Sequence, residues 1–419
     1  MSKFAAPKGV SEYFPPRSQN FEFVRNTLIG EAVVSGYQLI ELPVFEDTEL
    51  FKRGVGESTD VVSKEMYTFE DRGGRSITLR PEGTAGVMRS VIENNLDKGQ
   101  LPVKIWYSGA FFRAERPQAG RYRQFYQVGV EAIGLSEPEI DVEVIAIADR
   151  AFKKLGLKKY RLDITSLGDA SSRAAHRVDL IKFIEGLNLD DATAVRAKLN
   201  PLRLFDDKRP EISSAMSKAP VLLDYLSEES RKSFESVKSL LEDFGIAYQI
   251  NPRMVRGLDY YTGTTFEFVH ELLGAQSGIG GGGRYDGLMS QLGGADLSGI
   301  GFGLGVDRIL LACEAEGIFS SDAVTSSLEI YLIPLGSENT KFVTNLLNQL
   351  RNSGVIADMS YGDRALKGAM KSADKSGAKY SCVIGESEIS SGSLTLKEMK
   401  SGVTKEVRID SLAQALKEI

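Results

Sequence analysis

Residues 113–131 of this 419-residue chain read Arg113-Ala-Glu-Arg-Pro-Gln-Ala-Gly-Arg-Tyr-Arg-Gln-Phe-Tyr-Gln-Val-Gly-Val-Glu131. The segment is rich in arginine and aromatic residues, and Pro117 and Gly120 lie near its middle. Apolar, aromatic and charged residues recur at alternate positions on both sides of this turn: Val103, Ile105, Tyr107, Phe111, Arg113 and Glu115 before it, and Phe125, Gln127 and Glu131 after it. Period-two patterning around a short Pro/Gly connection predicts an antiparallel hairpin.

The predicted hairpin directs Arg113, Glu115, Phe125, Gln127 and Glu131 to one face, and its tip, residues 116–123, is strongly cationic. An ordinary solvated hairpin is the alternative, but surface strands rarely combine Arg, Glu, Gln and Phe on one side. A charged, aromatic face beside a basic loop favours a bound nucleotide together with a polyanion. The formal net charge of −6 argues against a generic nucleic-acid binder, so local patches must meet any polyanion.

The amino-acid composition narrows the class of protein further. Hydrophobic residues make up 42% and charged residues 26%, as in globular proteins with a sizeable core. No apolar run approaches the ~18 residues of a membrane span, and the N-terminus lacks a signal-peptide pattern. Cys313 and Cys382 form neither a disulfide framework nor a CxxC site. We therefore expect a cytoplasmic protein that does not associate with membranes.

Histidine is scarce, since only His176 and His270 occur. This excludes multi-histidine zinc sites, and it excludes a Ser-His triad unless one of the two serves in it. We interpret both as surface or packing residues. The chemistry of the chain is therefore expected to depend on arginines and carboxylates.

Residues 113–131 resemble motif 2 of the class II aminoacyl-tRNA synthetases, in the form found in histidyl-tRNA synthetases. Residues 256–263 (RGLDYYTG) and 280–288 (GGGGRYDGL) resemble two motifs peculiar to that family. Residues 301–308 (GFGLGVDR) are not a dinucleotide-binding GxGxxG, because the third glycine comes too early; they resemble class II motif 3. A predicted helix over 18–35 and strand over 37–42 resemble motif 1, which implies a homodimer.

The resemblance and the residue patterns together predict four segments. Residues 1–166 and 251–320 are expected to form two parts of an α+β catalytic domain with an antiparallel sheet, of the class II synthetase type. Residues 167–250, whose apolar positions follow helical spacing, are expected to form a helical insertion. A linker over 321–327 leads to residues 328–419, where strands alternate with helices as in a small α/β domain. That domain resembles the family's anticodon-binding domain.

The amino-acid pocket can be read partly from the residues themselves. Glu82, Thr84 and Gln127 offer acceptors for an α-ammonium group. Glu131, Tyr260 and Tyr261 offer a buried acceptor and ring walls for a flat, hydrogen-bonding side chain, and imidazole fits that description. The resemblance adds Gly83 and Tyr285, and implies that the catalytic residues Arg113 and Arg256 approach the substrate carboxylate and the α-phosphate. For Arg256, a structural ion pair at a strand edge is the alternative.

The resemblance also implies an ATP site. Phe125 and Arg308 would sandwich the adenine, and Arg113 would contact the α-phosphate region. Arg121 and Arg123 would contact the outer phosphates or tRNA, and Glu115 the adenine side or a metal. ATP is expected as a substrate, with Mg²⁺ bound to it, and no separate metal site of the protein is predicted. Amino-acid activation needs no general base, because the α-carboxyl is already ionised at pH 7; arginines suit the crowded negative charge.

In the C-terminal segment, Arg364, Lys367, Lys371 and Lys375 recur every three or four residues. On a helix over 363–376 they would form one basic stripe, with Leu366, Met370 and Ala373 facing inward. Such a stripe suits RNA phosphates, although a charge run is commonly just a solvated face. The resemblance favours tRNA binding.

The resemblance spans essentially the whole chain. It implies that L-histidine is activated with ATP to histidyl-adenylate and transferred to the 3′ end of tRNA(His). A rival of another class is a non-charging regulatory paralogue of the ATP phosphoribosyltransferase type, but such relatives usually lose the basic loop and the anticodon domain. A second rival, a class II synthetase for another amino acid, is disfavoured by residues 256–261.

Overall fold

The computed structural model describes residues 4–418 except 208, 320–327 and 363. The chain forms two compact units, Met1–Phe319 and Ser320–Ile419, which are described separately. The predicted linker over 321–327 lies outside the described residues.

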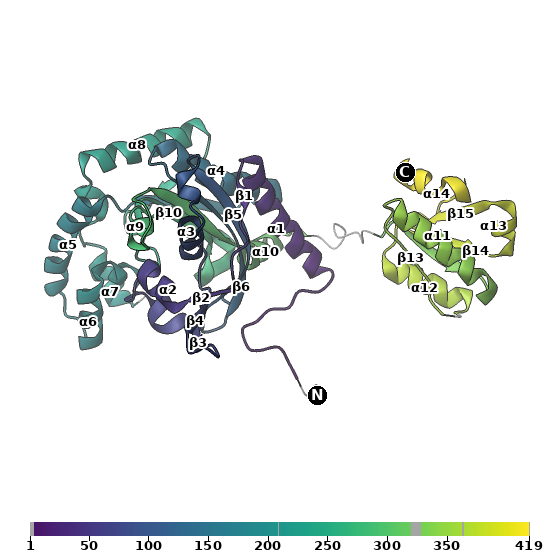
Figure 1. Ribbon diagram of the computed structural model, residues 1–419, viewed down its shortest axis with the longest axis horizontal. Helices are drawn as coiled ribbons and strands as arrows, with labels where there is room; N and C mark the ends of the chain where they lie inside the picture. The colour runs from purple at the N-terminus through teal and green to yellow at the C-terminus, as the bar shows by residue number, and fades with distance from the viewer. Residues whose placement is uncertain (1–3, 208, 320–327, 363, 419) are drawn as a thin grey trace. The chain divides into compact units, whose positions relative to one another are not determined.

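The first unit is built on an eight-stranded sheet in the order β1-β5-β6-β11-β10-β9-β7-β8 (Figure 1). The strands are β1 (Gln38–Leu39), β5 (Val103–Phe112), β6 (Gln124–Ile133), β7 (Tyr160–Ser166), β8 (Gln249–Ile250), β9 (Thr262–His270), β10 (Gly278–Arg284) and β11 (Gly299–Gly305). In the described part of this sheet the edge strands β1 and β8 pair in parallel, and the ladders between the other strands are antiparallel. In the β5–β6 pair Phe111 lies opposite Phe125, so the predicted hairpin is confirmed.

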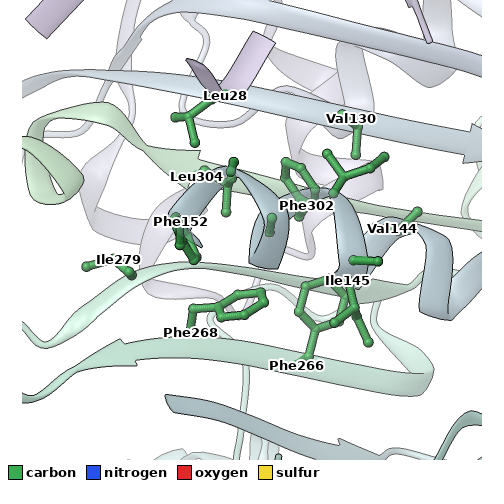
Figure 2. Close-up of a cluster of buried hydrophobic side chains, with 14 of the residues drawn as sticks. Leu28, Val130, Val144, Ile145, Phe152, Phe266, Phe268, Ile279, Phe302 and Leu304 are labelled. Atoms are coloured by element: carbon green, nitrogen blue, oxygen red, sulfur yellow. The ribbon is translucent and has the colours of Figure 1, made fainter. Parts of the chain in front are cut away.

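One face of the sheet is covered by α1 (Arg17–Val34), α4 (Pro138–Leu155), α8 (Glu228–Asp243) and α10 (Val306–Ala315). Alternate residues of the strands, among them Val130, Phe266, Phe268, Phe302 and Leu304, project into this layer and pack against the helices (Figure 2). Because successive side chains of a strand point to opposite faces, the residues between them lie on the other side of the sheet.

On that other side stand α2 (Thr48–Val55), α3 (Thr84–Glu93) and α9 (Leu288–Gln291), which form a second apolar cluster with Tyr107, Phe111 and Tyr285. A small sheet of β2 (Phe45–Asp47), β4 (Ser76–Leu79) and β3 (Tyr67–Glu70) adjoins them. The strand predicted over 37–42 is shorter than expected, since its ladder with β5 covers only Gln38 and Leu39.

Residues 167–250 are mainly helical. Helices α5 (Ala170–Glu185), α6 (Asp191–Leu199) and α7 (Pro210–Met216) enclose a small core of their own, which includes Leu180, Leu204 and Met216. Helix α8 differs, because its Phe234, Val237 and Leu241 belong to the core of the main sheet. The self-contained part of this segment therefore ends before α8.

Strand β11 reads Gly299-Ile-Gly-Phe-Gly-Leu-Gly305, so that one face carries apolar side chains and the other carries none. Ile300, Phe302 and Leu304 join the helix-covered core. A Cβ on Gly301 would stand 1.9 Å from Glu131 Oε2 and 2.4 Å from the Val130 carbonyl. The glycines of β11 thus form a bare floor that lets neighbouring side chains lie flat over the sheet.

The second unit holds a five-stranded sheet in the order β13-β12-β14-β15-β16. Its strands are β12 (Ile330–Pro334), β13 (Ala357–Met359), β14 (Tyr380–Ile384), β15 (Ser393–Glu398) and β16 (Thr404–Arg408), with helices α11 (Thr340–Asn352), α12 (Leu366–Ser376), α13 (Glu386–Ser391) and α14 (Leu412–Glu418). Strands β13, β12 and β14 pair in parallel. The predicted fold class, an α+β catalytic domain with a helical insertion and a C-terminal α/β domain, is confirmed.

Two expectations for the basic stripe are wrong. Helix α12 begins at Leu366, so Arg364 precedes it, although its guanidinium still reaches back to Ser372 Oγ at 2.7 Å. Leu366 is 44% exposed instead of facing inward. The buried face is carried by Ala369 and Ala373, because only small side chains fit where α12 lies close to the sheet residues Tyr331 and Ile333.

Both histidines are buried in structural positions. His176 Nε2 lies 2.8 Å from the Pro220 carbonyl oxygen, and His270 Nε2 lies 2.9 Å from Glu316 Oε1. Of the two interpretations offered above, packing therefore holds for both. Cys313 and Cys382 are free and buried. Among the described helices, none has the length and apolarity required to cross a membrane.

Candidate active site

Two cavities adjoin on the glycine face of the main sheet. Both are bounded by Arg113, Gln127, Arg256, Gly281 and Gly303, which therefore stand at their junction. The larger cavity is further lined by Glu115, Gly120, Arg121, Tyr122, Phe125, Glu267, Gly278, Ile279, Gly280, Gly305, Asp307 and Arg308. The smaller is further lined by Glu82, Gly83, Thr84, Tyr107, Leu258, Tyr260, Tyr261, Tyr285, Gly301 and Phe302.

A buried carboxylate caps the helix beside the smaller cavity. Glu82 accepts hydrogen bonds from the backbone N–H groups of Thr84 (2.7 Å) and Ala85 (3.0 Å), at the start of α3. The Tyr260 hydroxyl donates a third, at 3.3 Å. Burial raises the pKa of Glu82, while these N–H donors and Arg113 act in the opposite direction. The helix start thus fixes a carboxylate at the wall of the cavity.

Glu131 lies behind the lining of the smaller cavity, fully buried on β6. It accepts hydrogen bonds from three hydroxyls that belong to lining residues: Thr84 (2.8 Å), Tyr107 (3.2 Å) and Tyr285 (2.7 Å). Burial raises the pKa of Glu131 to about 8, although the three hydroxyls lower it. The carboxyl therefore orients the hydroxyl groups that the cavity presents to a ligand.

Arg256 stands over both cavities. Its guanidinium carbon lies 5.6 Å from the Tyr261 ring centroid, and Nη1 lies 3.5 Å from Glu267 Oε1. The Nε atom is buried without a hydrogen-bond partner. Burial lowers the pKa of Arg256, but Tyr261 and Glu267 outweigh it and the net shift is upward. A charged, largely shielded guanidinium that lines both cavities is suited to an anionic ligand.

The larger cavity is lined by several arginines and by the ring of Phe125. The Arg113 guanidinium lies 5.3 Å from the centroid of the Phe125 ring. Arg308 is held by the Gly120 and Gly278 carbonyls at 2.6 and 2.8 Å. Arg121 donates to the Glu115 carboxylate and lies 3.5 Å from Glu65. Burial lowers the pKa values of Arg113 and Arg308, yet an arginine stays charged at any pH where the protein is folded.

The structure brings together most of the site residues named from the sequence. Among those in the first unit, Arg123 and Glu131 are the two that do not line either of these two cavities. The Arg123 guanidinium donates to the Glu115 and Lys8 carbonyls, at 3.2 and 3.4 Å, and so fastens the hairpin tip to the N-terminal segment. The stripe residues Arg364, Lys367, Lys371 and Lys375 belong to the second unit.

Sequence reasoning missed Tyr107, Leu258 and Glu267. Tyr107 carried a usable signal, because it shares the period-two face of Phe111 with Phe125 and Gln127. Leu258 also carried one, since it alternates with Arg256 and Tyr260. Glu267 carried none, because its place beside Arg256 depends on the pairing of β9 with β10.

The comparisons with known proteins agree with this geometry. The structure of apo histidyl-tRNA synthetase from S. aureus matches with a TM-score of 0.83 and 37% identity, covering 99% of this chain and 100% of that one. An antiparallel catalytic sheet of this kind, followed by an anticodon-binding domain, defines a class II aminoacyl-tRNA synthetase. Family profiles described as histidyl-tRNA synthetase and anticodon-binding domain match residues 9–309 and 329–419.

Two curated relatives extend the match over nearly the full length. The histidine–tRNA ligase of Saccharopolyspora erythraea is 60% identical over 418 residues, covering 100% of this chain and 99% of the relative. That of Corynebacterium efficiens is 58% identical over 414 residues, covering 99% and 96%. The chain belongs to the histidyl-tRNA synthetase family.

Proposed function

We propose that the chain activates L-histidine with ATP to histidyl-adenylate and transfers the histidyl group to the 3′ end of tRNA(His), the reaction of a histidine–tRNA ligase. The observation that carries this proposal is the junction of the two cavities. A small, hydroxyl-lined cavity meets an arginine-rich one at Arg113, Gln127 and Arg256. An amino acid in the first and ATP in the second would bring the carboxylate and the α-phosphate together there.

Activation forms a bond from a carboxylate oxygen of histidine to the α-phosphorus and breaks the bond from that phosphorus to the bridging oxygen. Pyrophosphate leaves with the electron pair, and no proton has to move. The catalytic need is alignment and neutralisation of negative charge. We assign this role to Arg113 and Arg256, because both are partly buried, charged and common to the two cavities.

For the histidine itself, Glu82, Gly83, Thr84 and Gln127 are proposed to hold the α-ammonium end. The side chain would lie toward Glu131, Tyr260, Tyr261 and Tyr285. Glu131 acts there through the hydroxyls of Thr84, Tyr107 and Tyr285 that it orients. A pocket that must satisfy its own buried polar groups rejects aliphatic side chains, because they would leave those groups unpaired.

For ATP, the adenine is proposed to stack on Phe125 with Arg308 on its other side, and the phosphates to lie between Arg113 and Arg121. Arg123 would support the loop that carries Arg121. Mg²⁺ is proposed to arrive with ATP. The carboxylates of Glu115 and Glu267 line the same cavity and are the oxygen donors that Mg²⁺ takes, so the residues fit the ion. Bound Mg²⁺ would neutralise phosphate charge.

The second unit is proposed to bind tRNA through Lys367, Lys371 and Lys375 on α12, with Arg364 beside them. The chain is proposed to act as a cytoplasmic homodimer through α1 and β1, where Phe23, Val33, Val34 and Leu39 are 50%, 52%, 78% and 56% exposed. We retain as proposals the four-segment division and its borders at 166, 250, 320 and 328. The regulatory paralogue is not favoured, because residues 329–419 match an anticodon-binding domain and the loop at 116–123 is basic.

ATP–pyrophosphate exchange measured with each of the twenty amino acids tests the proposed activation. Exchange with histidine alone is expected. Exchange with proline or threonine at a comparable rate would overturn the assignment. The absence of exchange with every amino acid would overturn it as well. Aminoacylation of tRNA(His) with labelled histidine then tests the second step.

A further inference from the structure

The loop that carries Arg256 divides its residues between two sides. Arg256, Leu258, Tyr260 and Tyr261 line the smaller cavity. The residues between them face outward, where Gly257 presents its carbonyl and Asp259 its carboxylate to other segments. The loop is therefore a thin wall, with the cavity on one side and the helical insertion on the other.

Asp259 is the point where this wall is fastened. Its carboxylate accepts hydrogen bonds from Ser58 Oγ (2.8 Å), Asn200 Nδ2 (3.0 Å) and an Arg203 guanidinium nitrogen (3.3 Å). Its backbone N–H donates to the Val55 carbonyl at 3.1 Å. A Cβ on Gly56 would stand 2.8 Å from Asp259 Oδ2, so the carboxylate lies tightly against the segment after α2.

Two of these partners come from the insertion. Asn200 and Arg203 lie at the turn after α6, and their own segment packs in the separate small core of α5 to α7. The same Arg203 nitrogen also donates to the Gly257 carbonyl at 2.8 Å. The Arg203 side chain is only 15% exposed and that of Asp259 31%, so the contact is partly shielded from water.

We propose that Arg203 and Asn200 are positioning residues for histidine activation: through Asp259 and Gly257 the insertion holds the 256–261 wall in the geometry that binds the amino acid. This inference rests on the proposed assignment of the smaller cavity to histidine. Arg203 touches neither cavity, so its effect reaches the substrate only through the wall. Loss of the contact lets the wall relax toward solvent and weakens the histidine site, while the ATP cavity keeps its lining.

The test compares Arg203→Ala with Arg209→Ala in the full-length protein. Arg209 is a matched control, because it lies in the same insertion and its ion pairs are with Asp190 and Asp207 of that insertion. Histidine-dependent pyrophosphate exchange is measured without tRNA, and the active fraction is set by the burst of adenylate formation. Arg203→Ala should lower kcat/KM for histidine about tenfold, the size expected for a shielded charged hydrogen bond. The KM for ATP of Arg203→Ala should stay within about twofold of the wild-type value, because the ATP cavity keeps its lining. The kcat/KM of Arg209→Ala for histidine should also stay within about twofold, because Arg209 does not take part in the contact with the wall.

Further variants separate a positioning role from simple loss of folded protein. Arg203→Lys, which keeps the charge and a donor, should recover part of the histidine KM. In an Asp259→Ala background, Arg203→Ala should cost less than it does in the wild type, since only the hydrogen bond to the Gly257 carbonyl remains to be lost. If Arg203→Ala unfolds the chain, Asn200→Ala serves instead, with an expected rise of about threefold in the histidine KM.

Equal effects of Arg203→Ala and Arg209→Ala, or a loss of active fraction with an unchanged histidine KM, would overturn the proposal. Tyr261→Phe keeps this result distinct from a failure of the site assignment. If Tyr261→Phe alters the histidine KM and Arg203→Ala does not, the positioning role is wrong and the pocket stands. If neither does, the pocket assignment is wrong as well.

Discussion

Replacing Gly301 by alanine tests whether the bare face of β11 is a requirement of the site. The added Cβ would lie 1.9 Å from Glu131 Oε2 and 2.4 Å from the Val130 carbonyl. The carboxylate cannot move freely because three hydroxyls hold it, and the carbonyl belongs to the neighbouring strand. Overpacking of this kind costs about 1–3 kcal/mol, and two fixed neighbours put Gly301→Ala at the upper end.

Gly305 is a matched control at the other end of the same strand. A Cβ there would meet its nearest neighbours at 3.6 and 3.8 Å, which is ordinary contact. Gly305→Ala should therefore lie within about 0.5 kcal/mol of wild type. Trp106, the single tryptophan, lies on β5 of the same sheet, so its fluorescence during urea unfolding at fixed protein concentration reports on this unit. A Gly301→Ala loss below about 0.5 kcal/mol, or equal to that of Gly305→Ala, would refute the reasoning.

Three further outcomes are expected. Arg256→Ala should lower histidyl-adenylate formation about 10²–10³-fold while the urea midpoint holds, since the charge at the α-phosphate is lost; near-normal single-turnover rates would make Arg256 structural. Glu131 has a folded pKa raised to about 8, so its stability contribution is full below the unfolded pKa and falls as pH rises toward 8. The free energy of unfolding of the wild type, measured with urea, should fall by up to about 1.4 kcal/mol per pH unit between pH 6 and 7.5. Glu131→Gln should remove that fall, and an identical pH dependence in both proteins would contradict the raised pKa of Glu131. Lys367→Glu combined with Lys371→Glu should weaken tRNA binding and flatten its salt dependence, while pyrophosphate exchange is unchanged. As a control, Lys405→Glu on β16 should change neither the tRNA affinity nor its salt dependence. If the double variant leaves both unchanged, the stripe is a solvated face.

Much of this architecture follows from periodicity. Alternation around the hairpin predicted that Phe125 and Gln127 would share a face, and the register of β5 with β6 confirms it. The same alternation in β11 separates the core residues from the glycine floor, although the sequence analysis interpreted residues 301–308 only through their resemblance to class II motif 3. Local pattern was sufficient wherever one ladder decides the geometry.

The parts that could not be predicted depend on contacts between distant segments. Glu267 lies beside Arg256 because Arg256 packs against Gly281 of β10, which pairs with Glu267 of β9. Asp259 meets Arg203 because the insertion folds back on the loop. The start of α12 was misplaced because Arg364 and Leu366 fit the helical spacing, while the small Ala369 and Ala373 decide which face is buried. The spacing of residues along a helix does not determine which of two apolar faces packs against the sheet.

His176 and His270 are buried and line neither of the two cavities, which has consequences for NMR of bound histidine and for translation of this chain. The chain has two histidines and neither lines these cavities, so in a sample where protein and ligand histidine are both ¹⁵N-labelled the bound histidine adds its ring resonances to those of two imidazoles. Its protonation state in the bound complex can therefore be read directly by NMR. The ribosome meets a histidine codon only twice in 419 residues when it translates this chain. A cell short of charged tRNA(His) can thus still synthesise the protein proposed to replenish it, with fewer pauses than an average message of that length imposes.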